Sequence, residues 1–425
     1  MISPRTARSW LALAAVSALP AAVDAEDWMQ FRGPNGSATG KADAVPAEWT
    51  ETRNVVWKTE LPGAGTSSPI IVRGKVYLTC FSGYNVPGRR GSMSALKRML
   101  VCLDRKGGKT LWTRDLKVAL PEKDRIRDNH GYVSSTPVSD GEGLYVFCGK
   151  SGVFAFGLDG RPRWHADVGS GLSGWGSAAS PILFGNLLIV NASVESGSLL
   201  ALDKKSGKQV WRVEGIKEAW NTPLLVPVKG GRTELVVAVP QKVIGLHPTS
   251  GKELWTCATG ITWYMVPSMV AHDGVVYCVG GRSGKAGSLA VRAGGRGDVT
   301  ETHRLWRSDK RSNVSSPVYH DGHLYFAHEQ QAVAYCLNAK TGEVVYEERL
   351  GPRAGQVYPS PVLAGGNLYY VTRRGGTFVV PAKPTFKLLA HNSLGDRSTF
   401  NASPAVSGNH LLIRSDTYLY CLGKP

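Results

Sequence analysis

The feature that most constrains the fold is an internal repeat. A Ser-Pro or Thr-Pro pair recurs seven times along the chain, and the looser pair Val266-Pro267 adds an eighth copy. The prolines of the eight copies are Pro69, Pro137, Pro181, Pro223, Pro267, Pro317, Pro361 and Pro404. Successive prolines are 42 to 50 residues apart, except for the first two, which are 68 apart. A fixed period of this length indicates that each repeat forms one supersecondary unit.

Each repeat is typical of four short strands. Residues 317–326 hold two apolar stretches around Asp321-Gly322, a dipeptide that favours a tight hairpin turn. Residues 199–211 then give a second hairpin, in which a Ser-Gly-Lys turn leads to Trp211. Four strands every ~40–45 residues predict the blade of a β-propeller. We therefore predict an all-β fold, an eight-bladed propeller of four-stranded antiparallel blades.

The last repeat indicates how the ring closes. Residues 401–422 end after a third strand, and residues 54–61 can supply the fourth. A blade built from both ends of the chain leaves no sheet edge open at the closure. The predicted organisation is a signal peptide at 1–25, an extended segment at 26–53 and one propeller domain at 54–425.

Tryptophan and cysteine recur at fixed places in the repeat. Six tryptophans share one position and are predicted to pack between adjacent sheets: Trp57, Trp112, Trp164, Trp211, Trp255 and Trp306. Three cysteines precede a leucine at another shared position and are predicted to be small buried residues: Cys102, Cys336 and Cys421. Of the seven cysteines, Cys80 and Cys102 fall on neighbouring predicted strands and form the one pair to test for a disulfide.

The first 25 residues predict export. Arg5 and Arg8 precede an apolar stretch at 10–19, and a small-x-small pattern ends at Ala25. The apolar stretch is shorter than the ~20 residues that span a bilayer, and no later stretch approaches that length. We expect a periplasmic or extracellular protein without a transmembrane segment. Because the first cysteine is Cys80, we do not expect a lipid anchor.

The hairpin with Leu-Asp, a Ser/Thr-Gly-Lys turn and tryptophan resembles the repeat of the pyrroloquinoline-quinone-type (PQQ-like) β-propellers. The resemblance extends over residues 54–422, and residues 28–34 also resemble the start of exported propellers of this kind. It implies one of two functions, that of a quinoprotein alcohol dehydrogenase or that of a non-catalytic scaffold of the outer-membrane assembly BamB type. The sequence departs from both patterns, because it has no Cys-Cys pair, no C-x-x-C-H haem motif and no cysteine placed for lipidation.

A candidate ligand site lies in the segments before the innermost strands, which converge on one mouth of a propeller channel. These segments are rich in aromatic and amide side chains. The candidate binding residues are Tyr132, Trp175, Trp220, Asn221, Trp263, Tyr264, Asn313, Tyr358 and Asn401. Such residues would bind a planar organic ligand or a sugar. The alternative is that they fill the channel and hydrogen-bond the tops of the blades.

Catalytic signals are sparse, and we assign no catalytic and no metal-binding residue. Glu195 with Asn191, and Glu218 with Asn221, have oxygen atoms that could bind the Ca²⁺ of a quinoprotein. The His320 and His323 pair has metal-ligand spacing, but it lies on a predicted hairpin turn, which favours solvated histidines. No nucleophile-elbow, zinc-protease or phosphate-loop motif occurs in a suitable context.

The formal net charge of +17 is concentrated in two stretches. Residues 89–127 hold twelve basic and four acidic residues, and residues 282–311 hold eight and three. Both stretches coincide with insertions in the two longest repeats. We expect these basic insertions to project from the rim, where they can meet an acidic surface. Nucleic acid is not an expected partner, because export and the lack of a basic groove motif argue against it.

The predicted function is that of an exported, non-catalytic PQQ-like propeller, a monomer that binds a protein partner or a small ligand at the channel mouth. The alternative is a PQQ- and Ca²⁺-dependent quinoprotein oxidoreductase that acts on an alcohol or a sugar. No cofactor is assured by the sequence, and PQQ with Ca²⁺ belongs to the second function alone.

Overall fold

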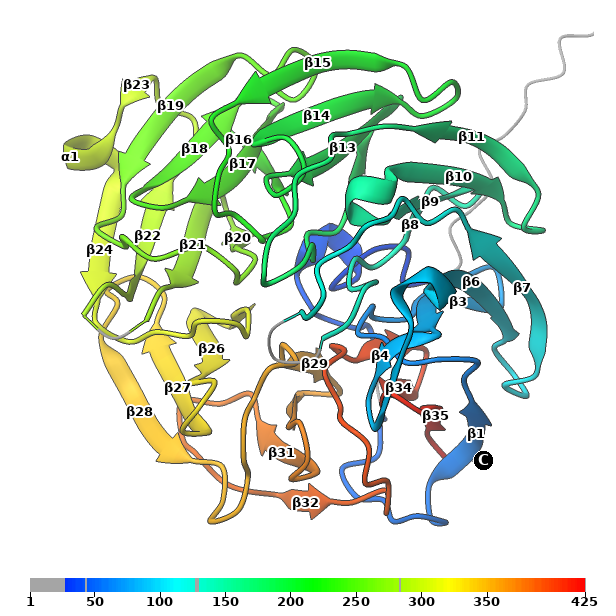
Figure 1. The fold of residues 1–425 in the computed structure, drawn as a ribbon. Coiled ribbons are helices and arrows are strands. Elements are labelled where there is room, and N and C mark those ends of the chain that lie inside the picture. Colours follow the sequence, from blue (N-terminus) through cyan, green and yellow to red (C-terminus); the bar gives the residue numbers. More distant parts are fainter. Residues whose placement is uncertain (1–26, 43, 127–129, 283, 425) are drawn as a thin grey trace, which may run out of the picture.

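The computed structural model describes residues 27–42, 44–126, 130–282 and 284–424. Eight sheets of four or five strands surround a central axis (Figure 1). The predicted eight-bladed all-β propeller is confirmed. The predicted signal peptide at 1–25 lies outside the described residues.

The first four blades follow one another along the chain, each from its inner strand to its outer strand. Blade 1 consists of β2 (Ile70–Val72), β3 (Lys75–Ser82), β6 (Lys97–Asp104) and β7 (Thr110–Leu116). Blade 2 consists of β8 (Val138–Ser139), β9 (Gly143–Phe147), β10 (Val153–Gly157) and β11 (Pro162–Ala166). Blade 3 consists of β12 (Ile182–Phe184), β13 (Leu187–Ala192), β14 (Ser198–Asp203) and β15 (Gln209–Glu214). Blade 4 consists of β16 (Leu224–Val228), β17 (Arg232–Val239), β18 (Lys242–Leu246), β19 (Glu253–Ala258) and β23 (Gly297–Asp298).

The remaining blades complete the ring. Blade 5 consists of β20 (Val270–His272), β21 (Val275–Gly280), β22 (Gly287–Arg292) and β24 (Arg304–Ser308). Blade 6 consists of β25 (Val318–His320), β26 (His323–Ala327), β27 (Val333–Asn338) and β28 (Val344–Arg349). Blade 7 consists of β29 (Val362–Ala364), β30 (Asn367–Val371), β31 (Thr377–Pro381) and β32 (Ala390–Asn392). Blade 8 consists of β33 (Ala405–Ser407), β34 (His410–Arg414), β35 (Tyr418–Leu422) and β1 (Val55–Glu60).

Small elements decorate the connections. The pair β4 (Tyr84–Val86) and β5 (Arg89–Gly91) forms a separate hairpin between β3 and β6. The short helices are η1 (Pro34–Gly36), η2 (Met93–Ala95), η4 (Gly149–Ser151) and α1 (Thr300–His303).

The ring closes in blade 8 as the sequence predicts. The strand β1 pairs antiparallel with β35, so Glu60 is opposite Tyr418 and Val55 is opposite Leu422. In Figure 1 the blue strand β1 lies beside the red strand β35, next to the C-terminus. The two ends of the propeller domain therefore share one sheet.

The repeated tryptophans join neighbouring blades. The indole Nε1–H of Trp57, Trp164, Trp211 and Trp306 donates to a backbone carbonyl in the turn before the outer strand of the next blade, at 2.9–3.1 Å. The predicted packing of these side chains between adjacent sheets is confirmed. Trp255 differs, because its indole donates to Oε2 of Glu234 within blade 4, at 2.7 Å.

A ring of hydroxyl groups joins the innermost strands. In front of the inner strands of blades 1 to 7, a backbone N–H donates to the Ser or Thr hydroxyl at the same place in the next blade, at 2.9–3.1 Å. The eight residues of this hydroxyl ring are Ser68, Thr136, Ser180, Thr222, Ser268, Ser316, Ser360 and Ser403. Each lies two residues before its inner strand.

The fifth copy of the repeat corrects the predicted alignment. In the sequence Val266-Pro267 is aligned with the Ser/Thr-Pro pairs, but in the structure the residue equivalent to their Ser or Thr is Ser268, in front of β20. Hydrogen bonding sets the register, since only a side-chain hydroxyl can accept from the preceding blade.

The seam between blades 8 and 1 is built differently from the other seven. The hydroxyl of Ser68 is buried and has no hydrogen-bond partner among the described residues. Instead, the buried guanidinium of Arg414 in β34 donates to the carbonyl and the hydroxyl of Ser67, both at 2.8 Å. A charged side chain thus bridges the seam where the hydroxyl ring is open.

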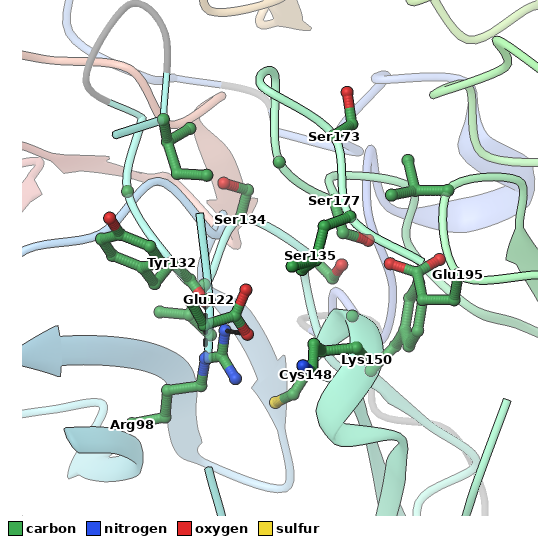
Figure 2. A pocket seen from close by; sticks show the side chains of 18 of the residues that line it. Arg98, Glu122, Tyr132, Ser134, Ser135, Cys148, Lys150, Ser173, Ser177 and Glu195 are labelled. Carbon is green, nitrogen blue, oxygen red and sulfur yellow. Dashed lines mark hydrogen bonds and ion pairs between the residues drawn. The ribbon is translucent and has the colours of Figure 1, made fainter. Parts of the chain in front are cut away.

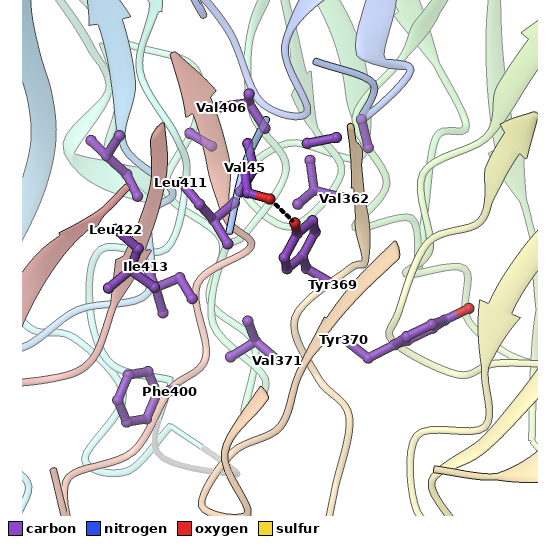
Figure 3. Packing of buried hydrophobic residues seen from close by; sticks show 14 of the residues in the cluster. Val45, Val362, Tyr369, Tyr370, Val371, Phe400, Val406, Leu411, Ile413 and Leu422 are labelled. Atoms are coloured by element: carbon purple, nitrogen blue, oxygen red, sulfur yellow. Dashed lines mark hydrogen bonds between the residues drawn. The ribbon is translucent and has the colours of Figure 1, made fainter. Parts of the chain in front are cut away.

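The segment before β1 packs across the ring and into its core. Trp28 and Ile71 exchange backbone hydrogen bonds, and the N–H of Gly40 donates to the carbonyl of Leu363 on the other side of the seam. Figure 3 shows the core of blades 7 and 8, where the hydroxyl of Tyr369 donates to the carbonyl of Val45 at 3.1 Å. The segment therefore contributes to the propeller core.

All seven cysteines are free and buried. Cys80 and Cys102 lie on adjacent strands, but Cys80 is opposite Met99 and Cys102 is opposite Tyr77, so the register keeps the two sulfur atoms apart. The disulfide that the sequence left open is not formed. The predicted small buried positions at Cys102, Cys336 and Cys421 are confirmed, and each faces the aromatic residue of its outer strand.

We expect Gly342→Ala to destabilise the protein more than Gly322→Ala does. Both glycines lie in turns of blade 6, with φ of +78° and +75°, so alanine strains both backbones by about 1–2 kcal/mol. A Cβ on Gly342 would lie 2.6 Å from the Trp306 ring, whereas one on Gly322 would meet no atom within 4 Å. Overpacking of this kind costs a further ~1–3 kcal/mol. Denaturant unfolding measures the difference, and equal losses would show that Trp306 does not clamp this turn.

Candidate functional site

A cavity of about 450 Å³ lies on the axis of the propeller. The hydroxyl ring lines it, together with side chains from the segments that lead into the inner strands. Phe31, from the segment before β1, also lines it. That segment hydrogen-bonds the inner strands of blades 1, 2 and 7, and Arg32 donates to the carbonyl of Pro317 in front of blade 6. It therefore lies across one end of the channel, and we call the cavity, whose lining residues lie toward the other end, the well.

Aromatic side chains form the wall of this well at blades 3 to 5. The ring of Tyr264 lies 5.8 Å from Trp175 and 5.6 Å from Trp220, centre to centre. The indole N–H of Trp220 donates to the carbonyl of Gly176 at 2.8 Å, so its one polar atom is already bonded. This wall therefore offers mainly apolar ring surface to a ligand.

Amide side chains form the wall at blades 6 to 8. Arg373 organises part of it: its guanidinium donates to Oδ1 of Asn401 at 2.9 Å and to Oε1 of Gln356 at 2.8 Å. The same guanidinium lies 4.5 Å from the ring centre of Tyr358. Asn313 is buried, and its Oδ1 has no hydrogen-bond partner among the described residues. The amide Nδ2 of Asn401 is likewise buried without one.

The structure brings six of the nine candidate ligand residues to this cavity and places three elsewhere. Trp175, Trp220, Tyr264, Asn313, Tyr358 and Asn401 line it. Their role toward a ligand remains a prediction.

Three candidates do not line the cavity, and each has a structural reason. Tyr132 is buried beside Phe81 and Tyr84 under the blade 1 insertion, and its hydroxyl donates to the carbonyl of Lys123 at 2.8 Å. Asn221 is fully buried, because its amide bonds both the carbonyl and the N–H of Ala238. The ring of Trp263 packs against Tyr264, 5.0 Å away centre to centre, and does not line the cavity.

Several residues of the cavity could not be identified from the sequence. Gln330, Gln356 and Arg282 line the well, but no motif marks them. The hydroxyl ring is marked in the sequence by the Ser/Thr-Pro pair, which we interpreted only as a marker of the repeat.

The donor atoms do not suit the Ca²⁺ of a quinoprotein. Hard cations prefer carboxylate and carbonyl oxygens, and no aspartate or glutamate is among the described residues that line the well. Within the described ranges, no group of three His, Cys, Asp or Glu side chains could hold a metal ion. The proposed ligand pairs lie apart from the well: Asn191 is buried and its Oδ1 already accepts the N–H of Ser193 at 3.2 Å, and Glu218 is exposed.

Glu195 lies instead in a second, smaller cavity between blades 2 and 3 (Figure 2). Its carboxyl is buried, and Oε2 has no hydrogen-bond partner among the described residues. Burial raises the pKa of this carboxyl to about 7. The cavity measures about 30 Å³, which is room for roughly one water molecule.

A buried ion pair stands beside Glu195. The Arg98 guanidinium donates to Oε1 of Glu122 at 2.6 Å, to the carbonyl of Tyr132 at 2.7 Å and to the hydroxyl of Ser151 at 2.5 Å. Both charged side chains are almost completely buried. This ion pair ties the loop 117–133 to β6 and blade 2.

The same loop is tied to the hairpin β4–β5. The hydroxyl of Tyr84 donates to the carbonyl of Asp124 at 2.9 Å, and the amide of Asn85 donates to the hydroxyl of Tyr132 at 3.1 Å. We call residues 82–97 and 117–126 the crest. Its two parts connect the second strand of blade 1 to the third, and the fourth to blade 2. In an antiparallel blade both connections lie at the end where the inner strands begin, so the crest stands beside the well.

The second basic insertion has a different position and charge. Residues 293–303 connect the third and fourth strands of blade 5, so they lie on the opposite face of the ring from the crest. Arg296 is bound to Glu234 at 3.1 Å, and Lys310 to Glu347 at 2.8 Å. Much of the charge of this stretch is therefore neutralised within the protein.

The His320 and His323 pair flanks the predicted hairpin turn, because His320 ends β25 and His323 begins β26. The Nε2 of His320 is 3.3 Å from the Asp321 carboxylate, and the Nδ1 of His323 faces the backbone carbonyl of the same residue at 2.7 Å. No helix in the described part of the chain is long and apolar enough to cross a membrane.

Comparison with known proteins gives consistent matches. Residues 96–347 and 296–380 match the family described as outer membrane protein assembly factor BamB. The outer membrane protein assembly factor BamB of Burkholderia pseudomallei is 25% identical over 394 residues, which cover 80% of this chain and 93% of that protein.

Two solved structures share the fold. BamB from Moraxella catarrhalis aligns with a TM-score of 0.62 and 14% identity, over 87% of this chain and 97% of that chain. A europium-containing methanol dehydrogenase aligns with a TM-score of 0.62 and 12% identity, over 94% of this chain and 98% of that chain. At these identities the likeness shows the fold alone.

We expect the substitution Glu195→Gln to change how stability depends on pH. The folded protein raises the pKa of this carboxyl from its usual value near 4.5 to about 7. Between these values the native state holds a proton that the unfolded state has released, so the free energy of unfolding falls as pH rises, by up to about 3 kcal/mol.

Denaturant unfolding at pH 4, 6 and 8 tests this expectation. In Glu195→Gln the free energy of unfolding should fall less as pH rises, because the amide does not titrate. In the control Glu218→Gln, at an exposed position, it should fall as in the wild type. An unchanged decline in Glu195→Gln would contradict the assignment.

Proposed function

Because the chain belongs to the PQQ-like propeller family described as outer membrane protein assembly factor BamB, we propose that it is an exported, non-catalytic scaffold that binds a protein partner through the crest. The predicted signal at 1–25 and the names of its relatives support an exported location. The fold of that family and the lack of a recognisable catalytic motif support a binding role.

The observation that carries the proposal is the construction of the crest. It presents six exposed basic side chains, none of which makes an ion pair with the residues that the structure describes. They are Arg89, Arg90, Lys97, Lys117, Lys123 and Arg125. Placing like charges together costs free energy unless an opposite charge compensates them. The crest is therefore suited to an acidic surface on a partner.

The buried pair Arg98–Glu122 supports this interpretation. Burying two charges carries a desolvation penalty that a well-packed apolar pair would avoid. What the pair supplies is position, since three hydrogen bonds of Arg98 join β6, the loop 117–133 and blade 2. A crest fixed in this way presents its charges without a further loss of conformational entropy when a partner binds.

The quinoprotein alternative receives less support from the well. A PQQ- and Ca²⁺-dependent oxidation needs a cation site, and the described wall offers amides and hydroxyls in place of carboxylates. The scaffold function needs no such site.

We expect the triple variant Arg89→Ser, Arg90→Ser, Lys97→Ser to lose its partner. Three positive charges disappear from the crest, so attraction to an acidic surface weakens and association slows. Crosslinking of the exported protein in its native host, followed by mass spectrometry, would show a partner that is captured by the wild type and lost by the variant. Binding of that partner should also weaken as salt rises, since exposed charges are screened over about 8–10 Å.

The matched control is Lys205→Ser, Lys208→Ser, Lys252→Ser. These exposed lysines lie in turns on the opposite face, so the control loses the same charge and should retain the partner. Equal capture by the crest variant and the control would contradict the proposed role of the crest.

A further inference from the structure

The axial well has a chemistry that the scaffold function does not use. Trp175, Trp220 and Tyr264 come from the segments that lead into blades 3, 4 and 5, and the amide side chains come from blades 6, 7 and 8. In an eight-membered ring blade 3 faces blade 7 and blade 4 faces blade 8. Trp175 therefore faces Tyr358 and Gln356 across the well, and Trp220 faces Asn401.

The well does not suit a charged ligand. No carboxylate lies among its described lining residues, so a cationic ligand would have no counter-ion there. His130 has both ring nitrogens engaged, Nδ1 with the hydroxyl of Ser134 and Nε2 with the carbonyl of Trp175. Arg282 is exposed and lies in the connection between β21 and β22. Arg373 is not among the residues that line the well, and its guanidinium is bound to the side-chain oxygens of Asn401 and Gln356. The described lining therefore holds one cation besides the engaged His130, and that cation is exposed.

The well has polar capacity that the protein does not satisfy. Asn313 Oδ1 can accept a hydrogen bond and Asn401 Nδ2 can donate one, and both are buried without a partner among the described residues. Seven hydroxyls of the ring accept a backbone N–H, and none donates its own hydrogen to another described residue. A buried polar group without a partner is destabilising, and a ligand that pairs it recovers that free energy.

From these observations we propose that the axial well binds an uncharged saccharide of about two sugar units. A pyranose has an apolar face of C–H groups and a rim of hydroxyls that both donate and accept. The apolar face would pack on the wall of Trp175, Trp220 and Tyr264. The sugar hydroxyls would hydrogen-bond the amides and the hydroxyl ring. The cavity of about 450 Å³ lies within the range of ~300–1,000 Å³ that is typical of small-ligand pockets.

A planar aromatic ligand fits less well. It would stack on the same wall, but its edge carries few donors and acceptors, so most of the polar groups around the well would stay unpaired. A planar anion would in addition find only Arg282, an exposed arginine, among the described lining residues, because Arg373 is bound to Asn401 and Gln356. The hydroxyl-rich ligand is the one that satisfies both walls.

Calorimetry and intrinsic tryptophan fluorescence test the proposal with the purified full chain. The probes are maltose, cellobiose, lactose, mannobiose and chitobiose at millimolar concentration, with PQQ and Ca²⁺ as a separate titration. We expect at least one disaccharide to bind and to change the emission of the tryptophans. If no disaccharide binds, or if PQQ binds in the well and the disaccharides do not, the proposal is wrong.

Variants locate the binding. Asn401→Ala removes an unpaired donor and should weaken disaccharide binding about tenfold, and Trp220→Leu, which removes part of the aromatic wall, should weaken it at least as much. The control Asn186→Ala changes an exposed amide in the turn of blade 3 and should leave the affinity unchanged.

Thermal unfolding of each variant shows whether it is folded before binding is compared. If Asn401→Ala does not fold, Trp220→Leu and Asn313→Ala carry the test. If these well variants bind the disaccharide with the wild-type affinity, the sugar binds elsewhere and the proposal is wrong. The crest variant should bind the disaccharide as the wild type does, so a failure of the scaffold proposal and a failure of this one can be told apart.

Discussion

A single hydrogen bond, repeated from blade to blade, sets the geometry on which the rest of this propeller depends. The N–H in front of an inner strand donates to a hydroxyl in the next blade, and seven such bonds of 2.9–3.1 Å run around the axis. The bond fixes the position of an inner strand along the propeller axis and its distance from the inner strand of the next blade. The tryptophans fix the outer side in the same way, since an indole from one blade covers a turn of the next. Both contacts join residues about one repeat apart, which makes the ring a chain of equivalent joints.

The closing seam is where this pattern changes. Blades 8 and 1 are joined by the guanidinium of Arg414, and Ser68 keeps an unpaired hydroxyl. The strand β1 holds the same seam on the outer side through its pairing with β35. The two blades come from opposite ends of the chain, so joining them costs chain entropy. The contacts at the seam must offset this cost. A buried charged bridge and a shared sheet meet that requirement without the regular bond.

The two faces of the ring serve different purposes. The segment before β1 lies across one end of the channel, and the well lies toward the other, beside the crest. The basic residues also differ in how far their charge is compensated. The six exposed cations of the crest make no ion pair with a described residue, whereas Arg296 and Lys310 are paired with Glu234 and Glu347. A net charge of +17 is therefore a poor guide by itself, because its effect depends on which cations face solvent.

The sequence alone determined the number of blades, the strand that closes the ring and the role of the repeated tryptophans, because these follow from periodic patterns within ~45 residues of chain. It also predicted that Trp175, Trp220 and Asn401 lie at the channel, where they line the well, since each lies in the segment that leads into an inner strand. It could not distinguish them from Asn221 and Tyr132, which precede inner strands equally but turn into the core. It aligned Val266-Pro267 with the Ser/Thr-Pro pairs, whereas Ser268 is the equivalent residue, because a proline is visible in the sequence and a hydrogen bond between blades is not. Only the tertiary structure decided which side chains line the well, which acids neutralise the basic insertions and how the seam is bridged. All of these are contacts between residues far apart in the chain, and no local pattern specifies them.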